Sequence, residues 1–398
     1  MTASIISGDS HIDLPWLPPD LFVTGASAAL KDRMPHVLDG PSGPYWTIAG
    51  GWQGVGMPVA QQQHFMLVNG IGIFGVKYRP GHSHRTDRIA SEGVYDDGAK
   101  GIRRITDPDM RTRDQDRDGV RAEVIFGLTG IERFYADNEA VAEIYRIYNE
   151  WLGDFCRRHP ARHIGLAPVL LHDVDVAVAQ VRRAGQLGLK GILLYPHPNL
   201  TGGGGRYPLW HEALEPVWKA AADYNLHIHI HSTGPDLQLP PREASIVNHN
   251  RARAVFASSF QLSSASQLTA ILFTGIFERY PNLKLVLGEF GAGWIPYMVD
   301  MMDKVSGNRN LGRDCGLKKP PSEYYRDHVL AVIIDEPLVG TLIDVLGEDN
   351  LMYGTDYPHI DGTWPDSHAE FEKNYGALKP EHKEKLAWRN AARLYGLN

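Results

Sequence analysis

Short, nearly continuous apolar runs alternate with amphipathic segments along most of this chain. Eight of these runs have the length and the β-branched content of strands, and from about residue 120 onward each is followed by a segment with helical spacing. The predicted strands cover residues 5–11, 120–126, 163–170, 190–197, 226–232, 283–290, 329–335 and 351–359. Strands without polar alternation indicate a parallel sheet that is buried on both faces.

The segments between these runs predict the helices that a parallel sheet requires. They cover residues 138–159, 173–188, 208–225, 263–280, 294–306, 337–346 and 381–395. Eight strand–helix units over this length fit a (β/α)8 barrel better than an open, doubly wound sheet. No GxGxxG follows the first strand, so a dinucleotide-binding fold is not indicated. We therefore predict an α/β TIM barrel, formed as a single domain by residues 1–398.

One interval breaks this rhythm. Residues 12–119 separate the first two predicted strands, which is far more than a barrel needs. The stretches 41–56 and 69–78 are rich in glycine and aromatic residues, which suggests hairpins and loops. Long insertions after a barrel strand usually build the lid and the substrate pocket. We expect residues 40–119 to form such an inserted lid or hairpin segment within the barrel domain.

Several predicted strands end on side chains that bind metals. Asp9 and His11 are two residues apart at the end of the first strand, so both can face the barrel axis. Asp356 lies near the end of the eighth strand, which neighbours the first when a barrel closes. Active sites of such barrels lie at the C-terminal ends of the strands. Imidazole and carboxylate bind zinc, iron and manganese, so these residues predict a metal site there.

The fifth and sixth strands add further candidates. The fifth contains the sequence HIHIH at 227–231, and its outer histidines lie about 13 Å apart at a rise of ~3.3 Å per residue. His231, nearest the C-terminal end, is the expected ligand. His229 could reach a second metal or support a ligand. Glu289 ends the sixth strand at a similar depth, and burying its carboxylate would be costly unless it were paired or bound to a metal.

Two more histidines follow strand ends. His197 ends the fourth strand and could complete a second metal site, although contact with substrate or with its own loop explains it equally well. His359 follows Asp356 by three residues, and we expect these two to be the catalytic pair. No GxSxG is present, and neither Cys156 nor Cys315 ends a strand, so covalent serine or cysteine catalysis is not indicated.

Charge and composition limit the classes of binding partner that the chain can have. With 40 Lys and Arg against 47 Asp and Glu, the net charge of −7 argues against nucleic acid and anionic membranes. No apolar stretch approaches the ~20 residues of a membrane span, and no secretory signal begins the chain. Two cysteines without CxxC spacing fit a reducing, cytoplasmic setting. We expect a small-molecule substrate as partner, and whether the chain forms a homo-oligomer stays open.

Taken together, these motifs resemble the amidohydrolase-2 (amidohydrolase-related) family of metal-dependent TIM barrels. The resemblance covers nearly the whole chain from Asp9 and rests on residues 8–11 (GDSH), 283–297, 319–324 (KPPSEY), 350–367 (NLMYGTDYPHIDGTWPDS) and 390–397. It implies one or two metals at the barrel mouth, with ligands at Asp9, His11, His231 and Asp356. The family includes hydrolases, non-oxidative decarboxylases of aromatic acids, and non-heme diiron monooxygenases of terpenoid antibiotic (platensimycin-type) biosynthesis.

The chain departs from the family pattern at three positions. Better-known members have HxH on the first strand, where this chain has Asp9. Members that use zinc or manganese commonly have a histidine on the sixth strand, where this chain has Glu289. The two-zinc hydrolases use a carboxylated lysine on the fourth strand, but here Lys190 begins that strand and His197 ends it.

The number of candidate ligands decides the predicted function. A single catalytic metal takes about three protein ligands, and this chain offers more. We therefore predict two metal ions, iron in the active form, and a diiron monooxygenase that uses dioxygen to hydroxylate a bulky, apolar, acyl-linked molecule of terpenoid type. The alternative is a zinc- or manganese-dependent hydrolase or a non-oxidative decarboxylase of a carboxylated small molecule. A non-catalytic binding protein is disfavoured, because every ligand position holds a competent residue.

Overall fold

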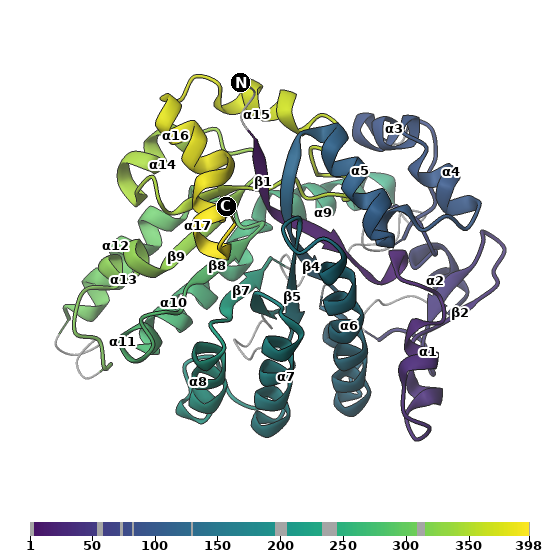
Figure 1. Cartoon of the computed structure of the whole chain (residues 1–398), viewed down its shortest axis with the longest axis horizontal. Helices are drawn as coiled ribbons and strands as arrows, with labels where there is room; N and C mark the ends of the chain where they lie inside the picture. Colours follow the sequence, from purple (N-terminus) through teal and green to yellow (C-terminus); the bar gives the residue numbers. More distant parts are fainter. Residues whose placement is uncertain are drawn as a thin grey trace.

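Eight parallel strands dominate the structure, a computed structural model that describes residues 4–53, 59–71, 75–81, 83–128, 130–195, 205–232, 245–308 and 315–397. The strands are β1 (Ile5–Ile12), β4 (Val120–Gly127), β5 (His163–Pro168), β6 (Gly191–Leu194), β7 (His227–His231), β8 (Leu285–Gly288), β9 (Val329–Ile333) and β10 (Leu351–Tyr353). They follow one another in the sheet in chain order (Figure 1).

The first and last strands meet and close the barrel. Ser10 forms a parallel bridge with Tyr357, and the amide of His11 donates to the carbonyl of Tyr357 at 2.7 Å. The amide of Asp356 donates to the carbonyl of Asp9 at 2.9 Å. The predicted (β/α)8 barrel is confirmed, and its closure places Asp356 beside the end of β1.

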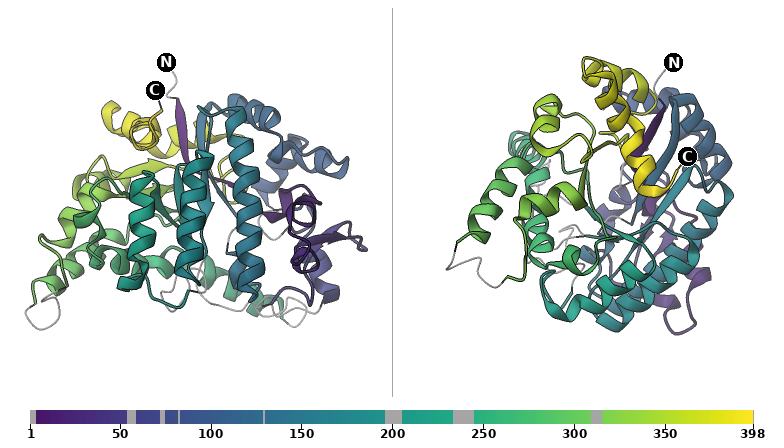
Figure 2. Two further views of the ribbon diagram at one scale, coloured as in Figure 1. Left: turned by 60° about the horizontal axis from the view of Figure 1, so that its bottom comes forward. Right: turned by 60° about the vertical axis from the view of Figure 1, so that its left-hand side comes forward.

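Helices pack around the outside of the strands (Figure 2). The predicted barrel helices appear as α6 (Asn138–Arg158), α7 (Val174–Leu187), α8 (Glu215–Asp223), α10 (Ala265–Phe273), α11 (Ile276–Arg279), α12 (Ile295–Ser306) and α14 (Val339–Leu346). Local signals set their ends: the Asp173 side chain accepts from the amide of Val176 where α7 begins, and Gly188 ends it in the left-handed conformation. The predicted helix 263–280 is divided because Gly275 has a φ of +67°.

Other helices were not expected or have different bounds. They are α5 (Pro108–Asp118), α9 (Ile246–Ser259), α13 (Pro321–His328) and α15 (Ser367–Tyr375). The expected closing helix consists of α16 (Pro380–Glu384), a π-helical turn (Lys385–Arg389) and α17 (Asn390–Tyr395). Helix α9 buries none of its residues, so it lacks the apolar face that reveals a helix in a sequence. No helix in the described ranges is long and apolar enough to span a membrane.

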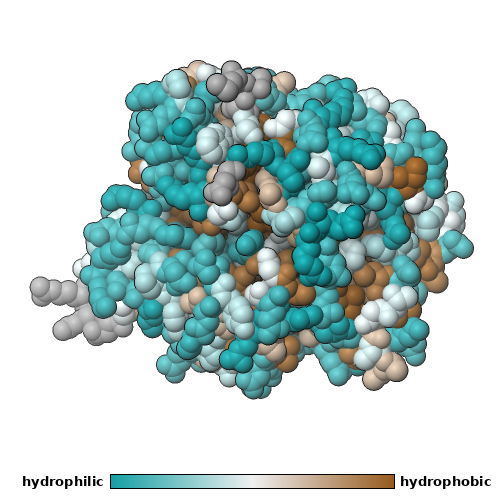
Figure 3. Space-filling view, viewed as in Figure 1, coloured by the Kyte–Doolittle hydropathy of each residue, from teal (hydrophilic) through white to brown (hydrophobic). Residues whose placement is uncertain are grey.

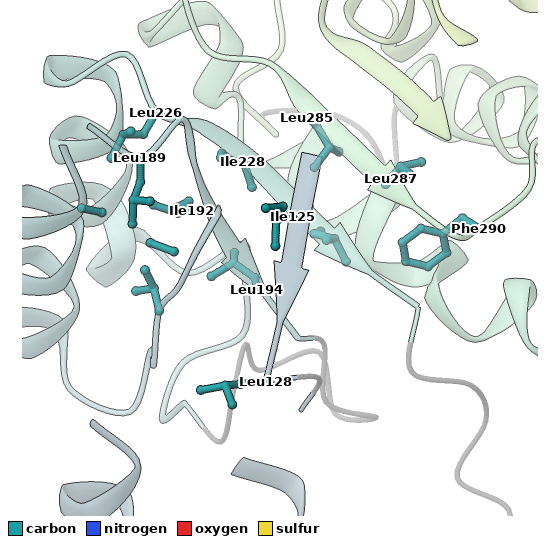
Figure 4. Close-up of a cluster of buried hydrophobic side chains, with 14 of the residues drawn as sticks. Ile125, Leu128, Leu189, Ile192, Leu194, Leu226, Ile228, Leu285, Leu287 and Phe290 are labelled. Atoms are coloured by element: carbon teal, nitrogen blue, oxygen red, sulfur yellow. The ribbon is translucent and has the colours of Figure 1, made fainter. Parts of the chain in front are cut away.

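The strands divide the core into two clusters. Side chains that point outward, such as Ile125, Ile228 and Leu285, pack beneath the helices (Figure 4). Neighbours such as Val124 and Val286 belong to a second cluster inside the barrel. This division follows from the two-residue period of a strand. Hydrophilic residues cover most of the molecular face in Figure 3, with apolar patches between them.

The segment between β1 and β4 contains short helices and one hairpin. Its elements are α1 (Leu21–Gly25), β2 (His36–Leu38), β3 (Tyr45–Thr47), α2 (Val59–Phe65), α3 (His84–Ser91) and α4 (Val94–Ala99), with α5 at its end. Arg85 pairs with Glu370 at 3.2 Å, and Arg88 pairs with Asp366 at 2.7 Å. These ion pairs tie α3 to the chain that follows β10. That residues 40–119 cover a bound substrate stays a prediction.

Candidate functional site

The end of β1 carries a row of polar side chains. Asp9, His11 and Asp13 occupy alternate positions, so they share one face of the chain, and each is at most 2% exposed. Ser10, between the first two, faces away and donates from Oγ to the carbonyl of Val124 at 2.8 Å. The two-residue period of the strand therefore places a carboxylate, an imidazole and a second carboxylate on one side of the barrel mouth.

His11 meets His231 across the mouth. Their Nε2 atoms lie 3.1 Å apart, and their rings are perpendicular, with an angle of 88° between the planes. Asp9 Oδ1 and Asp356 Oδ1 lie 3.2 and 3.3 Å from the same nitrogen of His11. Ligands at ~2.1 Å from one tetrahedral metal lie about 3.4 Å from one another, so these separations fit a shared cation.

Unpaired oxygens support the same conclusion. Within the described part of the chain, both carboxylate oxygens of Asp9 and Oδ2 of Asp356 are buried without a hydrogen-bond partner, whereas Asp356 Oδ1 lies 2.9 Å from His359 Nδ1. Buried carboxylates are costly unless they are paired or coordinate a metal. A divalent cation among these oxygens and the two Nε2 atoms would satisfy them. The donor set therefore fits a metal.

Neighbouring groups prepare both imidazoles to bind through Nε2. His231 Nδ1 lies 2.6 Å from the carbonyl of Ser232, which fixes the proton on Nδ1. His11 Nδ1 faces Asp13 Oδ2 at 3.5 Å. Burial lowers the pKa of His231 to about 4, so its ring is neutral, as a ligand must be. Burial also acts to lower the pKa of His11, but Asp13 and Asp9 raise it to about 9, so a proton can occupy this acidic site when a cation does not.

Glu289 lies at the edge of the same cluster. It follows β8 with a φ of +57°, and its Oε2 lies 3.5 Å from His231 Nε2. Its side chain is 19% exposed, more than those of Asp9 and Asp356. Burial, followed by repulsion from Asp356 and Asp9, raises the pKa of Glu289 well above its usual range. The structure therefore brings Glu289 to the edge of the predicted ligands.

His359 bridges two carboxylates. Its Nδ1 lies 2.9 Å from Asp356 Oδ1, and its Nε2 lies 2.9 Å from Asp13 Oδ2. Its ring stacks on that of His11, with centroids 4.0 Å apart and an angle of 26°. Stacked rings cannot both direct an in-plane lone pair at one metal, so His11, Asp13 and His359 form a poor second metal site. Burial acts to lower the pKa of His359, but Asp356 and Asp13 raise it well above 6.5.

The sequence interpretation missed two residues that hold this arrangement. One is Asp13, which the alternation of Asp9 and His11 could have revealed as the next inward position. The other is Arg111 of α5, which is fully buried and donates from Nη1 to the carbonyl of His11 at 3.0 Å. Its guanidinium also pairs with Glu123 and lies over the ring of Tyr357. Nothing in its charged surroundings on α5 distinguished it.

The remaining candidates lie away from this cluster or outside the described residues. His197 is outside them. His229 uses both ring nitrogens elsewhere: Nδ1 lies 3.1 Å from the carbonyl of His227, and Nε2 lies 2.8 Å from the hydroxyl of Tyr395. His229 is therefore not placed to bind a second metal.

The prediction of two iron ions finds no support in the described residues. Two groups of side chains there could hold a metal. One is Asp9, His11 and His231, and the other is His11, Asp13 and His359, in which the two histidine rings are stacked. The prediction rested on the number of candidate ligands, which exceeds the roughly three that a single catalytic metal takes. In the structure Asp356, one of the counted carboxylates, also lies 2.9 Å from His359, and His229 uses both ring nitrogens elsewhere.

Comparison with known proteins identifies relatives. The profile of a family described as amidohydrolase matches residues 80–397. The gamma-resorcylate decarboxylase of Polaromonas sp. strain JS666 is 23% identical over 298 residues, which are 73% of this chain and 87% of that protein. A solved amidohydrolase from Mycobacterium avium subsp. paratuberculosis K-10 covers 100% of both chains with a TM-score of 0.74 and 19% identity.

A second solved structure is that of 5-carboxyvanillate decarboxylase from Novosphingobium aromaticivorans DSM 12444, complexed with manganese and 4-hydroxy-3-methoxy-5-nitrobenzoic acid. It is 24% identical, has a TM-score of 0.59, and the match covers 80% of this chain and 85% of that one. The two relatives above that are named for a reaction are both decarboxylases. The prediction of a dioxygen-dependent diiron monooxygenase is therefore wrong. Ligand types misled it, because carboxylate and imidazole also bind metals that take no part in oxygen chemistry.

Proposed function

This chain belongs to the amidohydrolase family, and we propose that it is a metal-dependent decarboxylase that releases CO2 from a hydroxylated aromatic acid without dioxygen. One observation carries this proposal: Asp9, His11 and His231 each present a ligand atom within 4.8 Å of the others, buried at the C-terminal mouth of the barrel. The relatives that act on gamma-resorcylate and 5-carboxyvanillate support the choice of reaction and of substrate class.

Four residues would hold the metal: Asp9, His11, His231 and Asp356. We propose manganese, because solved structures of 5-carboxyvanillate decarboxylase and of dihydroxybenzoic acid decarboxylase contain it, and a carboxylate-rich donor set suits it. A bound divalent cation supplies a Lewis acid that orients an anionic substrate and stabilises negative charge on its oxygens.

The chain itself must supply a proton. When the bond to the carboxylate breaks, its electron pair stays on the ring carbon and CO2 leaves, so that carbon must take up one proton. His359 can hold a proton on Nδ1, 2.9 Å from Asp356 Oδ1, while Asp13 orients its other nitrogen. Its side chain is 11% exposed, which allows exchange with solvent. We assign proton delivery to the pair of Asp356 and His359.

The test is a carboxyl-labelled substrate in deuterated water. Metal-free protein is loaded with Mn²⁺ and incubated, with and without oxygen, with 2,6-dihydroxybenzoate and 5-carboxyvanillate carrying a ¹³C carboxyl group. We expect ¹³CO2 at the same rate in both atmospheres and a product with one deuterium on the carbon that lost CO2. His231→Ala should abolish the reaction, whereas His36→Ala, outside the cluster, should leave it unchanged.

Other outcomes would contradict the proposal. CO2 release that requires oxygen would restore an oxidative reaction. Loss of an ester or amide bond from related substrates, with the carboxyl group retained, would indicate a hydrolase.

A further inference from the structure

The three histidines of β7 all point into the barrel, but the proposed metal site uses only His231. The other two contact the C-terminal end of the chain. His227 Nε2 lies 3.3 Å from the carbonyl of Leu394, and His229 Nε2 lies 2.8 Å from the hydroxyl of Tyr395. These partners are separated from the histidines by 167 and 166 residues. The HIHIH sequence therefore joins one proposed metal ligand to the end of α17.

Helix α17 packs against β1 and β10, and in Figure 1 it lies in front of the strands, whereas α9 lies behind them. Tyr395 enters the barrel interior and belongs to the same buried cluster as Ile6, Val124 and Phe126. The contact between the carbonyl of Leu394 and His227, the first residue of β7, places the end of α17 at the N-terminal end of the barrel. Tyr395 thus reaches toward the metal site from the opposite end.

The hydrogen bonds fix the tautomer of His229. Its Nδ1 lies 3.1 Å from the carbonyl of His227, which can only accept, so the proton is on Nδ1. Nε2 is then an acceptor for the Tyr395 hydroxyl. Burial, followed by the charge of Asp9, raises the pKa of Tyr395 far above 10, so the hydroxyl keeps the proton that it donates. Both groups are satisfied, and neither is free to bind a metal.

The backbone of β6 and the ring of Phe126 pack near the His229 ring. A Cβ on Gly191 would lie 2.3 Å from its Cε1, so the ring rests directly on the backbone of β6. The ring of Phe126, fully buried, lies 6.0 Å from that of His229, 5.1 Å from that of His231 and 5.8 Å from that of His11. A displacement of His229 would therefore reach both imidazoles of the site through Phe126 and through β7.

An apolar residue would fill this layer of the barrel without needing a hydrogen-bond partner. The buried pair of polar groups fits a role in precise placement better than a role in filling space. We propose that Tyr395 is a positioning residue of the metal site: its hydrogen bond to His229 holds β7, and with it His231 Nε2, in register with Asp9 and His11. This inference rests on the proposed metal site.

The test compares two tyrosines that each lose one hydroxyl. Tyr395→Phe removes the bond to His229. Tyr324→Phe is the matched control, because Tyr324 is also almost fully buried but donates to Glu278 on the outside of the barrel. Removing a group that orients a metal ligand typically weakens metal affinity about 10- to 100-fold. We expect Tyr395→Phe to weaken Mn²⁺ binding by about 10-fold or more and Tyr324→Phe to leave it unchanged, with similar unfolding temperatures of the two metal-free variants.

A second variant tests whether Tyr395 acts through His229. His229→Gln should weaken Mn²⁺ binding as Tyr395→Phe does. The double variant should bind Mn²⁺ no more weakly than either single variant, because both substitutions remove the same hydrogen bond. Unchanged Mn²⁺ affinity in Tyr395→Phe would overturn the inference. If the wild-type protein binds no Mn²⁺, the proposed metal fails, and ¹⁵N spectra of the histidine side chains decide the inference. Tyr395→Phe should then shift the His231 resonances and Tyr324→Phe should not, and equal spectra would overturn it.

Discussion

His11 and His231 bring their Nε2 atoms to 3.1 Å although 220 residues separate them. Two neutral imidazole nitrogens that both present lone pairs repel at this distance, so a proton or a metal must lie between them. Asp9 and Asp356 surround the same point and carry unpaired oxygens. This contact explains why the cluster combines two imidazoles with two carboxylates: the arrangement is stable with a cation and strained without one.

Metal binding should therefore stabilise the fold. At a Mn²⁺ concentration of 100 times its Kd, the free energy of unfolding should rise by about 2.7 kcal/mol, because the unfolded chain has no formed site. His231→Ala should remove this gain. Differential scanning fluorimetry of metal-free protein with increasing Mn²⁺ measures it. An equal gain in wild type and His231→Ala would place the metal elsewhere.

Asp9→Asn should separate stability from metal binding. Asp9 is fully buried and close to Asp356, and its charge helps to raise the pKa of Glu289. Removing the charge should increase the free energy of unfolding of the metal-free protein by about 1 kcal/mol, as is common when an active-site residue is neutralised. The same variant should lose Mn²⁺-dependent activity. Urea unfolding without metal checks the first part, and a destabilised variant would contradict it.

The buried ion pair of Arg111 and Glu123 should stabilise the fold only when both partners are present. Both side chains are at most 2% exposed, and Arg111 also donates to the carbonyl of His11. Arg111→Met leaves a buried carboxylate unpaired, which should lower the free energy of unfolding by about 3–5 kcal/mol. The double variant with Glu123→Leu should recover part of this loss. A single variant as stable as wild type in urea would show that Glu123 takes up a proton instead.

Acid should destabilise the protein partly through His163. Burial lowers the pKa of His163 to about 2 in the folded protein, so its ring stays neutral there. In the unfolded chain the same ring gains a proton as the pH falls through about 6.5. The stability contributed by His163 is complete above pH 6.5 and is lost as pH falls below it, at up to about 1.4 kcal/mol per pH unit. His163→Phe keeps the ring stacked on Phe155 and should flatten this dependence between pH 7 and 5. Parallel curves for the two proteins would contradict the prediction.

The inserted segment should matter for substrate binding. Arg85 and Arg88 tie α3 to Glu370 and Asp366, and such partly exposed pairs contribute only about 0.2–1 kcal/mol each to stability. Replacing both arginines by alanine should therefore change the unfolding temperature little but raise KM several-fold. Arg182→Ala, an exposed position on α7, is the control. An unchanged KM would indicate that the segment does not cover the substrate.

The sequence by itself determined the barrel fold and the end of the barrel at which the main candidate metal ligands lie. Apolar runs and helical segments are local patterns, and the two-residue period of a strand fixes which side chains face inward. Asp9, His11 and His231 could therefore be assigned to one end of a barrel before any contact was known. Barrel closure then required Asp356 to lie near them, and the structure has it there.

Only the tertiary structure decided how these groups share their contacts. Separations of a few ångströms depend on barrel closure and on side-chain rotamers from distant elements, neither of which a local pattern contains. Asp13 therefore emerged as the partner of His359, His229 as the partner of Tyr395, and Arg111 as the support of His11. The same cause misdirected the functional prediction: the residue types were correct, but their number suggested two metals, because the sequence could not show which carboxylates already had a partner.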